Sequence, residues 1–169
     1  MNMDSLPEPW MRGPMKGVSP FVAPVLYSFQ QAREDLAEHT EGLTPGELWL
    51  RPFGFGPVGF HIRHAGGSVE RLTAYLEGKQ LAPEQLAAQQ QEMAPGANRE
   101  ELLAELEAAL ARAERVILRV DASQLTATRT VGRKRLPTTV IGLLIHIAEH
   151  TQRHVGQAIA AAKLARAMR

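Results

Sequence analysis

The chain has 169 residues, which suits one domain with a substantial hydrophobic core. Its 19 Lys and Arg nearly balance its 18 Asp and Glu, so it lacks the strong positive charge that attracts nucleic acid, and we expect no nucleic-acid partner. The sequence contains no cysteine, which excludes disulfides, thiolate metal ligands and a thiol nucleophile within the protein.

The start of the chain predicts an irregular arm and a cytoplasmic protein. Residues 1–17 lack the basic and apolar regions of a signal peptide, and no stretch reaches the roughly 20 apolar residues of a membrane span. Prolines and glycines indicate an irregular arm over residues 1–19, which Trp10 would pin to the body. We place the folded domain at residues 20–169 and expect no membrane partner.

The first half of that domain predicts two long helices. Apolar residues at helical spacing indicate a helix over residues 21–41, and the pattern Thr44-Pro45-Gly46-Glu47 predicts a capping box that opens one short turn. The second long helix is expected over residues 58–77. Its Gly66 and Gly67 each lower helix propensity by about 1 kcal/mol relative to Ala, so they indicate close approach of another helix or a ligand.

The second half predicts two more long helices. Residues 79–98 form a connection with a short helix at 83–92, and Asn98 caps a third long helix that ends near residue 120. Residues 121–137 predict either a short hairpin or a loop. Thr138 or Thr139 then caps the fourth and longest helix.

Four long amphipathic helices predict an all-α fold: an antiparallel four-helix bundle with a short extra helix and the irregular N-terminal arm. The long connection between the second and third helices allows a crossover in place of a simple up-and-down order. The alanine-rich end of the fourth helix, residues 158–167, predicts close packing against a second copy, so we expect a homodimer.

Three histidines at four-residue spacing in the fourth helix indicate a metal site. Residues i and i+4 of a helix lie on one face, so the imidazoles of His150 and His154 can converge on one ion. Both emerge from a largely apolar face, where an unpaired imidazole is costly. His146, one turn earlier, is expected to face solvent or to contact a ligand histidine, with a role as fourth ligand as the alternative.

A third ligand is expected on the second helix, because catalytic metal sites usually have three protein ligands and one open position. His64 is the better candidate, since it follows Phe60 by one turn, whereas His61 is expected to be a core residue. Three histidines suit zinc, nickel, copper or iron(II). Glu149 and Gln157 are candidates to orient the ligand rings, although surface contacts are the expected role of both.

Over most of its length the sequence resembles the DinB-like metal-binding four-helix bundles. The stronger match is the fourth-helix signature of two histidines four apart followed by Gly-Gln, here His150-Thr151-Gln152-Arg153-His154-Val155-Gly156-Gln157. The second is a ligand histidine followed by small residues, here His64-Ala65-Gly66-Gly67-Ser68. The resemblance implies the ligands His64, His150 and His154, with zinc or nickel as the metal.

The resemblance further implies a small-molecule reaction that uses a low-molecular-weight thiol such as bacillithiol, mycothiol or glutathione. We expect an S-transferase that adds this thiol to an electrophile, and a cysteine-free chain fits an imported nucleophile. Arg63 and Arg153 are candidates to hold a carboxylate of the thiol. No catalytic residue is assigned. A metal-dependent hydrolase, and a stress-response or interaction protein in which the metal only stabilises the bundle, are the alternatives.

Overall fold

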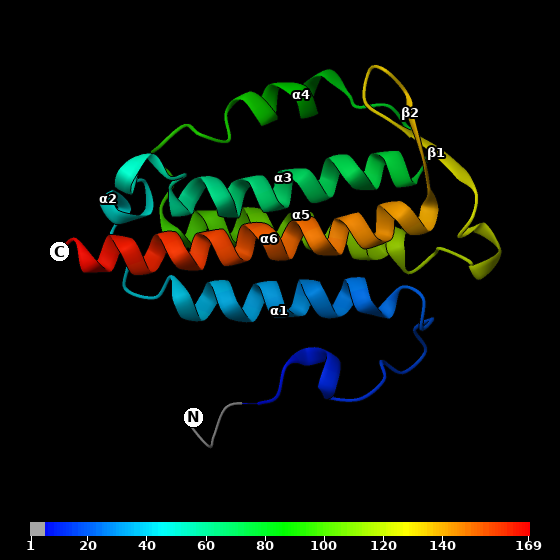
Figure 1. Ribbon diagram of the computed structural model, residues 1–169, viewed down its shortest axis with the longest axis horizontal. Coiled ribbons are helices and arrows are strands. Elements are labelled where there is room, and N and C mark those ends of the chain that lie inside the picture. Colours follow the sequence, from blue (N-terminus) through cyan, green and yellow to red (C-terminus); the bar gives the residue numbers. More distant parts are fainter. Residues whose placement is uncertain (1–5) are drawn as a thin grey trace.

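A computed structural model describes residues 6–169, so residues 1–5 of the expected arm lie outside the described part. Four long helices build the molecule: α1 (Ala23–His39), α3 (Val58–Leu76), α5 (Arg99–Ile117) and α6 (Val140–Ala167) (Figure 1). The short elements are α2 (Pro45–Leu48), α4 (Pro83–Gln90), β1 (Thr128–Val131), β2 (Leu136–Thr139) and the 3-10 turns Pro9–Met11, Pro52–Gly54 and Ala122–Gln124. The expected all-α bundle is therefore confirmed.

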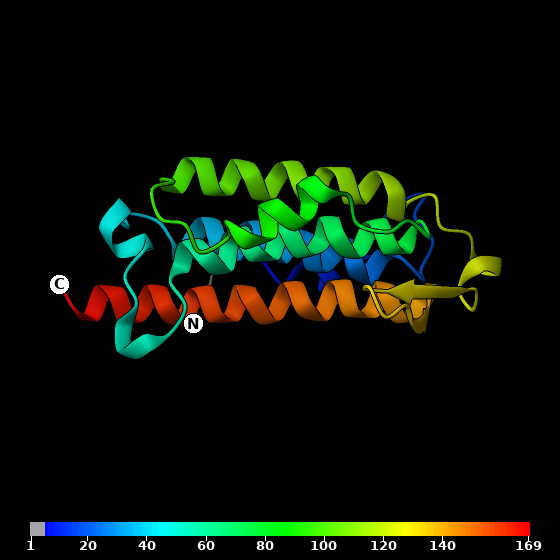
Figure 2. The same cartoon turned by 90° about the horizontal axis from the view of Figure 1, so that it is seen from above.

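Within the bundle, α3 and α5 run in the same direction. Arg63 pairs with Glu105, and Glu70 pairs with Arg112. Both pairs are 42 residues apart in sequence, and a separation that stays constant along two helices means that they run in parallel. α6 runs antiparallel to α3, and α3 contacts both α5 and α6 extensively. The chain between α3 and α5 returns along the bundle with α4 on the outside (Figures 1 and 2). This is the crossover that the long connection allows.

The helix ends follow the expected signals. The Thr44 hydroxyl accepts from the Glu47 amide, and the Glu47 carboxylate accepts from the Thr44 amide, which completes the predicted capping box. Thr139, one of the two expected caps, accepts from the Gly142 amide at 3.2 Å. The preceding segment forms the hairpin β1–β2, with Thr128 paired to Thr139.

The core lies between the four long helices. Its largest fully buried apolar side chains come from all four, for example Phe29, Ile62, Leu110 and Ile147. Near the end of α6, Ala158, Ala161, Ala162 and Ala165 are buried against the rest of the chain. These four alanines are thus not free to contact a second copy, whereas Ala160 and Ala167 of the same segment are exposed, and the homodimer stays a prediction.

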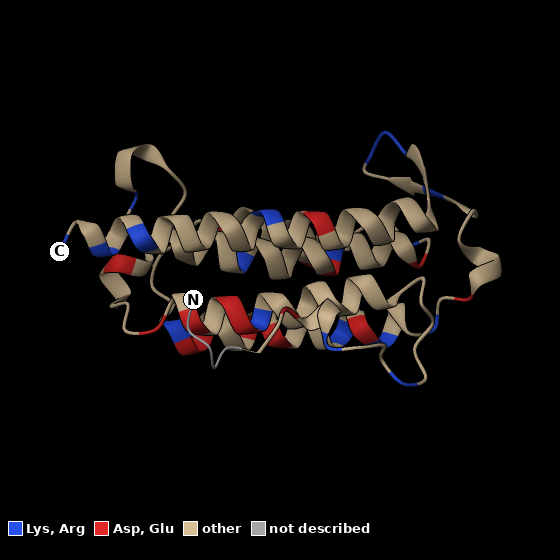
Figure 3. Ribbon diagram, turned by 60° about the horizontal axis from the view of Figure 1, so that its bottom comes forward, with Lys and Arg blue, Asp and Glu red and all other residues tan. Residues whose placement is uncertain are grey.

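Charged residues of both signs lie along the outer helix faces (Figure 3). Some of them join helices: Arg33 of α1 contacts both Glu107 and Glu114 of α5. Within the described residues, no helix is both long enough and apolar enough to cross a membrane.

The arm is held by residues other than the expected one. Trp10 is 62% exposed, and its indole N–H bonds to Glu8. The contacts with α1 come instead from Arg12, which forms two hydrogen bonds with Glu34, and from the Tyr27 hydroxyl, which donates to the Gly13 carbonyl. Trp10 therefore does not pin the arm in the way that the sequence analysis expected.

Candidate metal centre

Three histidines from two helices meet inside the bundle. His64 of α3 and His150 and His154 of α6 each offer a ring nitrogen, and the three nitrogens lie within 4.8 Å of one another. The antiparallel course of α3 and α6 brings them together, because residues early in α3 then face residues in the middle of α6. This is the group predicted from the four-residue spacing and the Phe60–His64 relation.

The geometry fits one ion. Nε2 of His64 lies 3.1 Å from Nε2 of His150. Two nitrogens bound to zinc at about 2.0–2.1 Å in tetrahedral geometry would lie roughly 3.3 Å apart. The other ring nitrogen of His150, Nδ1, is buried and has no hydrogen-bond partner among the described residues. Three imidazoles with a nitrogen pair at this spacing are a donor set that zinc, nickel, copper or iron(II) accepts.

The surroundings keep two of these imidazoles neutral. Burial, together with the proximity of His64, lowers the pKa of His150 to about 4 and the pKa of His154 to about 3. Near pH 7 each ring therefore has a lone pair available, which a metal requires of a histidine ligand.

The two remaining histidines of the clusters lie at the edge of the group. His61 is buried, as expected, and its Nδ1 lies 3.1 Å from Nδ1 of His154. Burial lowers its pKa, with a further contribution from His64. His146 is exposed and lies 3.6 Å from Glu149. Phe60 stacks on His64, with ring centroids 5.3 Å apart, and covers that ring with an apolar surface.

A buried carboxylate contacts the third ligand. Glu92, just beyond α4, is 4% exposed, and its Oε2 lies 2.6 Å from Nδ1 of His64. Its Oε1 accepts from Arg71, which is also buried, at 2.6 Å. The space for this pair exists because Gly67 has no side chain: a Cβ there would lie 2.5 Å from Glu92 Oε1. The predicted approach of another helix is found at Gly66, where a Cβ would lie 3.4 Å from Leu106 Cα of α5, whereas at Gly67 the approaching group is the Glu92 side chain.

Sequence reasoning missed Glu92 and considered Glu149 and Gln157 instead. Glu149 pairs with Arg153 on the exposed face of α6, and Gln157 is exposed. The one sequence signal for Glu92 was indirect: two adjacent glycines inside a helix, and a single acidic residue in the connection between Glu84 and Glu100.

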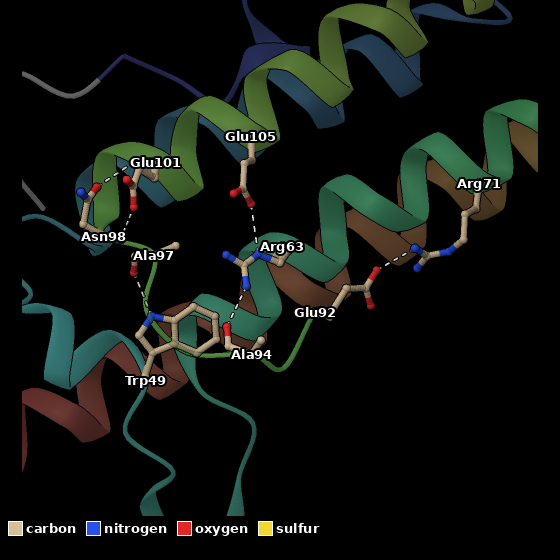
Figure 4. Close-up of polar contacts among 9 residues, drawn as sticks. All are labelled: Trp49, Arg63, Arg71, Glu92, Ala94, Ala97, Asn98, Glu101 and Glu105. Carbon is tan, nitrogen blue, oxygen red and sulfur yellow. Dashed lines mark hydrogen bonds and ion pairs between the residues drawn. The ribbon is translucent and has the colours of Figure 1, made fainter. Parts of the chain in front are cut away.

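The two candidate arginines differ in their surroundings. Arg63 donates to Glu105 and to the Ala94 carbonyl, and its guanidinium lies 5.1 Å from the ring centroid of Trp49 (Figure 4). Arg153 is half exposed and contacts Glu149, one turn earlier on α6. Of the two, Arg153 has fewer described partners to give up to a ligand.

The fold and the site define a class: an all-α bundle that can hold a metal ion between two antiparallel helices with three histidines. The family model of the DinB superfamily matches residues 28–158, a span that includes most of the chain and all three histidines. The chain belongs to the DinB superfamily, as the resemblance predicted. No curated protein matches it.

Proposed function

We propose that the protein is a metal-dependent S-transferase that joins a low-molecular-weight thiol to an electrophilic small molecule. The observation that carries the proposal is the group of three imidazoles, His64, His150 and His154, in a chain without cysteine. Such a chain has no thiol nucleophile of its own, whereas its donor set suits an ion that activates one.

The donor set determines what the site can do. Neutral imidazoles cancel none of the charge of a divalent ion, and three of them leave a coordination position for another molecule. Zinc or nickel held there would supply a Lewis acid that lowers the pKa of a thiol brought to it. Burial of His150 and His154 keeps both rings unprotonated, and Phe60 keeps water from one face of His64.

Arg153 is our candidate for binding the carboxylate of an acidic thiol. Its guanidinium lies on α6 beside the ligand histidines, and an exposed contact with Glu149 is worth little to stability, so it can be exchanged for a ligand carboxylate. Arg63 is the second candidate, although its bonds to Glu105 and Ala94 must then be kept or replaced.

The first test is elemental analysis of protein purified without a histidine tag. We expect one transition-metal ion per chain, lost in His64→Ala and in the His150→Ala, His154→Ala double variant while the helical circular dichroism remains. His146→Ala is the matched control, because His146 is an exposed histidine of the same helix and should leave the metal in place.

The second test measures the reaction. Metal-loaded protein is incubated with bacillithiol, mycothiol or glutathione and a panel of electrophiles, and thioether products are followed by mass spectrometry. We expect product with wild type, none with the double variant, and a higher KM for the thiol with Arg153→Ala. Metal-loaded protein that forms no thioether with any pair would refute the transferase, and ester or amide cleavage in parallel assays would favour the hydrolase.

A further inference from the structure

Glu92 makes two contacts, one with a buried arginine and one with a ligand histidine. Its Oε1 neutralises the buried guanidinium of Arg71, while its Oε2 accepts from Nδ1 of His64. A proton on Nδ1 leaves Nε2 of His64 without one, and Nε2 is the atom that faces Nε2 of His150 at 3.1 Å. The carboxylate thus selects the tautomer whose lone pair points toward the other ligands.

Glu92 does not belong to the four long helices. It lies in residues 91–97, which we call the docking segment, between α4 and α5. Two further contacts hold this segment: the Ala94 carbonyl accepts from Arg63, and the Ala97 carbonyl accepts from the Trp49 indole (Figure 4). These contacts are made by side chains of α3 and by Trp49, the residue that follows α2, so the segment lies on the side of the bundle that carries His64.

We propose that Glu92 is a positioning residue for the ligand His64, and that through it metal binding and docking of residues 91–97 stabilise each other. The inference rests on the metal centre alone and does not require thiol chemistry. A carboxylate that orients a ligand histidine contributes about 10–100-fold to metal affinity. Coupling between two binding events is reciprocal, so the metal must favour the docked segment by the same factor.

Gly67 supports a specific role for this carboxylate. Glycine is unfavourable inside a helix, and at this position its lack of a side chain admits the Glu92–Arg71 pair against α3. One oxygen of Glu92 is enough to balance the buried charge of Arg71, and the other oxygen contacts His64, whose ring faces the metal site.

The experiment compares Zn²⁺ affinity and hydrogen exchange in metal-free and zinc-loaded protein. Zn²⁺ is titrated in competition with a chromophoric chelator into wild type, Glu92→Gln and Glu105→Gln. Glu105→Gln is the matched control, since it also neutralises one carboxylate that pairs with an arginine of α3 but it does not touch a histidine. We expect the dissociation constant to rise about 10–100-fold in Glu92→Gln only.

Hydrogen exchange of the docking segment tests the coupling without any activity. Zn²⁺ should slow exchange at Glu92 and Ala94, whose amides bond to nearby carbonyls, by about the same factor in wild type and much less in Glu92→Gln. If Glu92→Gln does not fold, Gly67→Ala displaces the carboxylate without changing its charge. The proposal would be overturned if the folded variant bound Zn²⁺ as tightly as wild type. It would also be overturned if hydrogen exchange in the docking segment of wild type were the same with and without Zn²⁺. Loss of affinity in a protein that forms no thioether would support it and refute only the transferase.

Discussion

Replacing Gly67 by Ala should destabilise the protein, although the same change usually stabilises a helix. Alanine gains about 1 kcal/mol over glycine in a helix interior. At this position, however, the new Cβ would lie 2.5 Å from Glu92 Oε1 and 2.9 Å from Arg71 Nη1, whereas ordinary contact begins near 3.4 Å. The carboxylate must therefore shift by about 0.9 Å, the difference between 3.4 and 2.5 Å.

The energetic cost follows from the burial of the pair. Both side chains are nearly inaccessible to solvent, and breaking such a pair outright costs about 3–5 kcal/mol. The ends of both side chains can move and keep part of their attraction. After subtraction of the helix gain, we expect Gly67→Ala to lower the free energy of unfolding by about 1–3 kcal/mol.

Gly66 provides the control in the adjacent position. A Cβ there would lie 3.4 Å from Leu106 Cα and 3.5 Å from Ala109 Cβ, both of them ordinary contacts with α5. Gly66→Ala should thus be neutral or stabilising by up to about 1 kcal/mol. Urea unfolding of the metal-free variants, followed by circular dichroism, measures the difference. Gly67→Ala as stable as Gly66→Ala would refute the reasoning that the pair occupies this space.

Three further predictions concern stability. Because the pKa values of His150 and His154 are lowered to about 4 and 3, the unfolded chain binds more protons than the folded metal-free protein below about pH 6.5, so stability should fall between pH 7 and pH 4. Urea midpoints measured across this range should depend less on pH in the His150→Ala, His154→Ala double variant than in wild type. An equal pH dependence in the two proteins would contradict the assignment of the low pKa values to these histidines. Thr139→Ala should cost about 1 kcal/mol through loss of the helix cap, while Thr138→Ala, which removes no capping bond, should cost less. Leu110→Ala should cost about 2–5 kcal/mol in thermal or urea unfolding because the side chain is fully buried, and a loss under 1 kcal/mol would show that the core can close around it.

The helices and the three histidines could be predicted from the sequence because their signals are local. Helical spacing of apolar residues, the caps at Thr44 and Thr139, and the four-residue spacing of His150 and His154 depend only on neighbours along the chain. His64 required one more step, the assumption that two long helices face each other, and the family resemblance supported it.

Contacts that depend on the path of a connection could not be predicted in this way. The carboxylate nearest to His64 comes from Glu92, 28 residues later in the chain, and nothing near Glu92 shows where the crossover carries it. The same applies to the arm, where the expected anchor Trp10 is exposed and Arg12 makes the contact with Glu34. The adjacent glycines Gly66 and Gly67 and the lone acidic residue of the connection were the indirect indications that something approaches α3 at this height.

The parallel course of α3 and α5 has a consequence for how such a protein can diversify. If a tight turn joined α3 to an antiparallel α5, the residues that contact α3 would all belong to long helices, and packing in the core would constrain their sequences. Here the chain travels back along the bundle, and none of the residues of α4 is buried. A connection of this kind can change length and composition at little cost to folding. Substitutions in the connection between α3 and α5 can then change the residues around His64 without changing the four long helices.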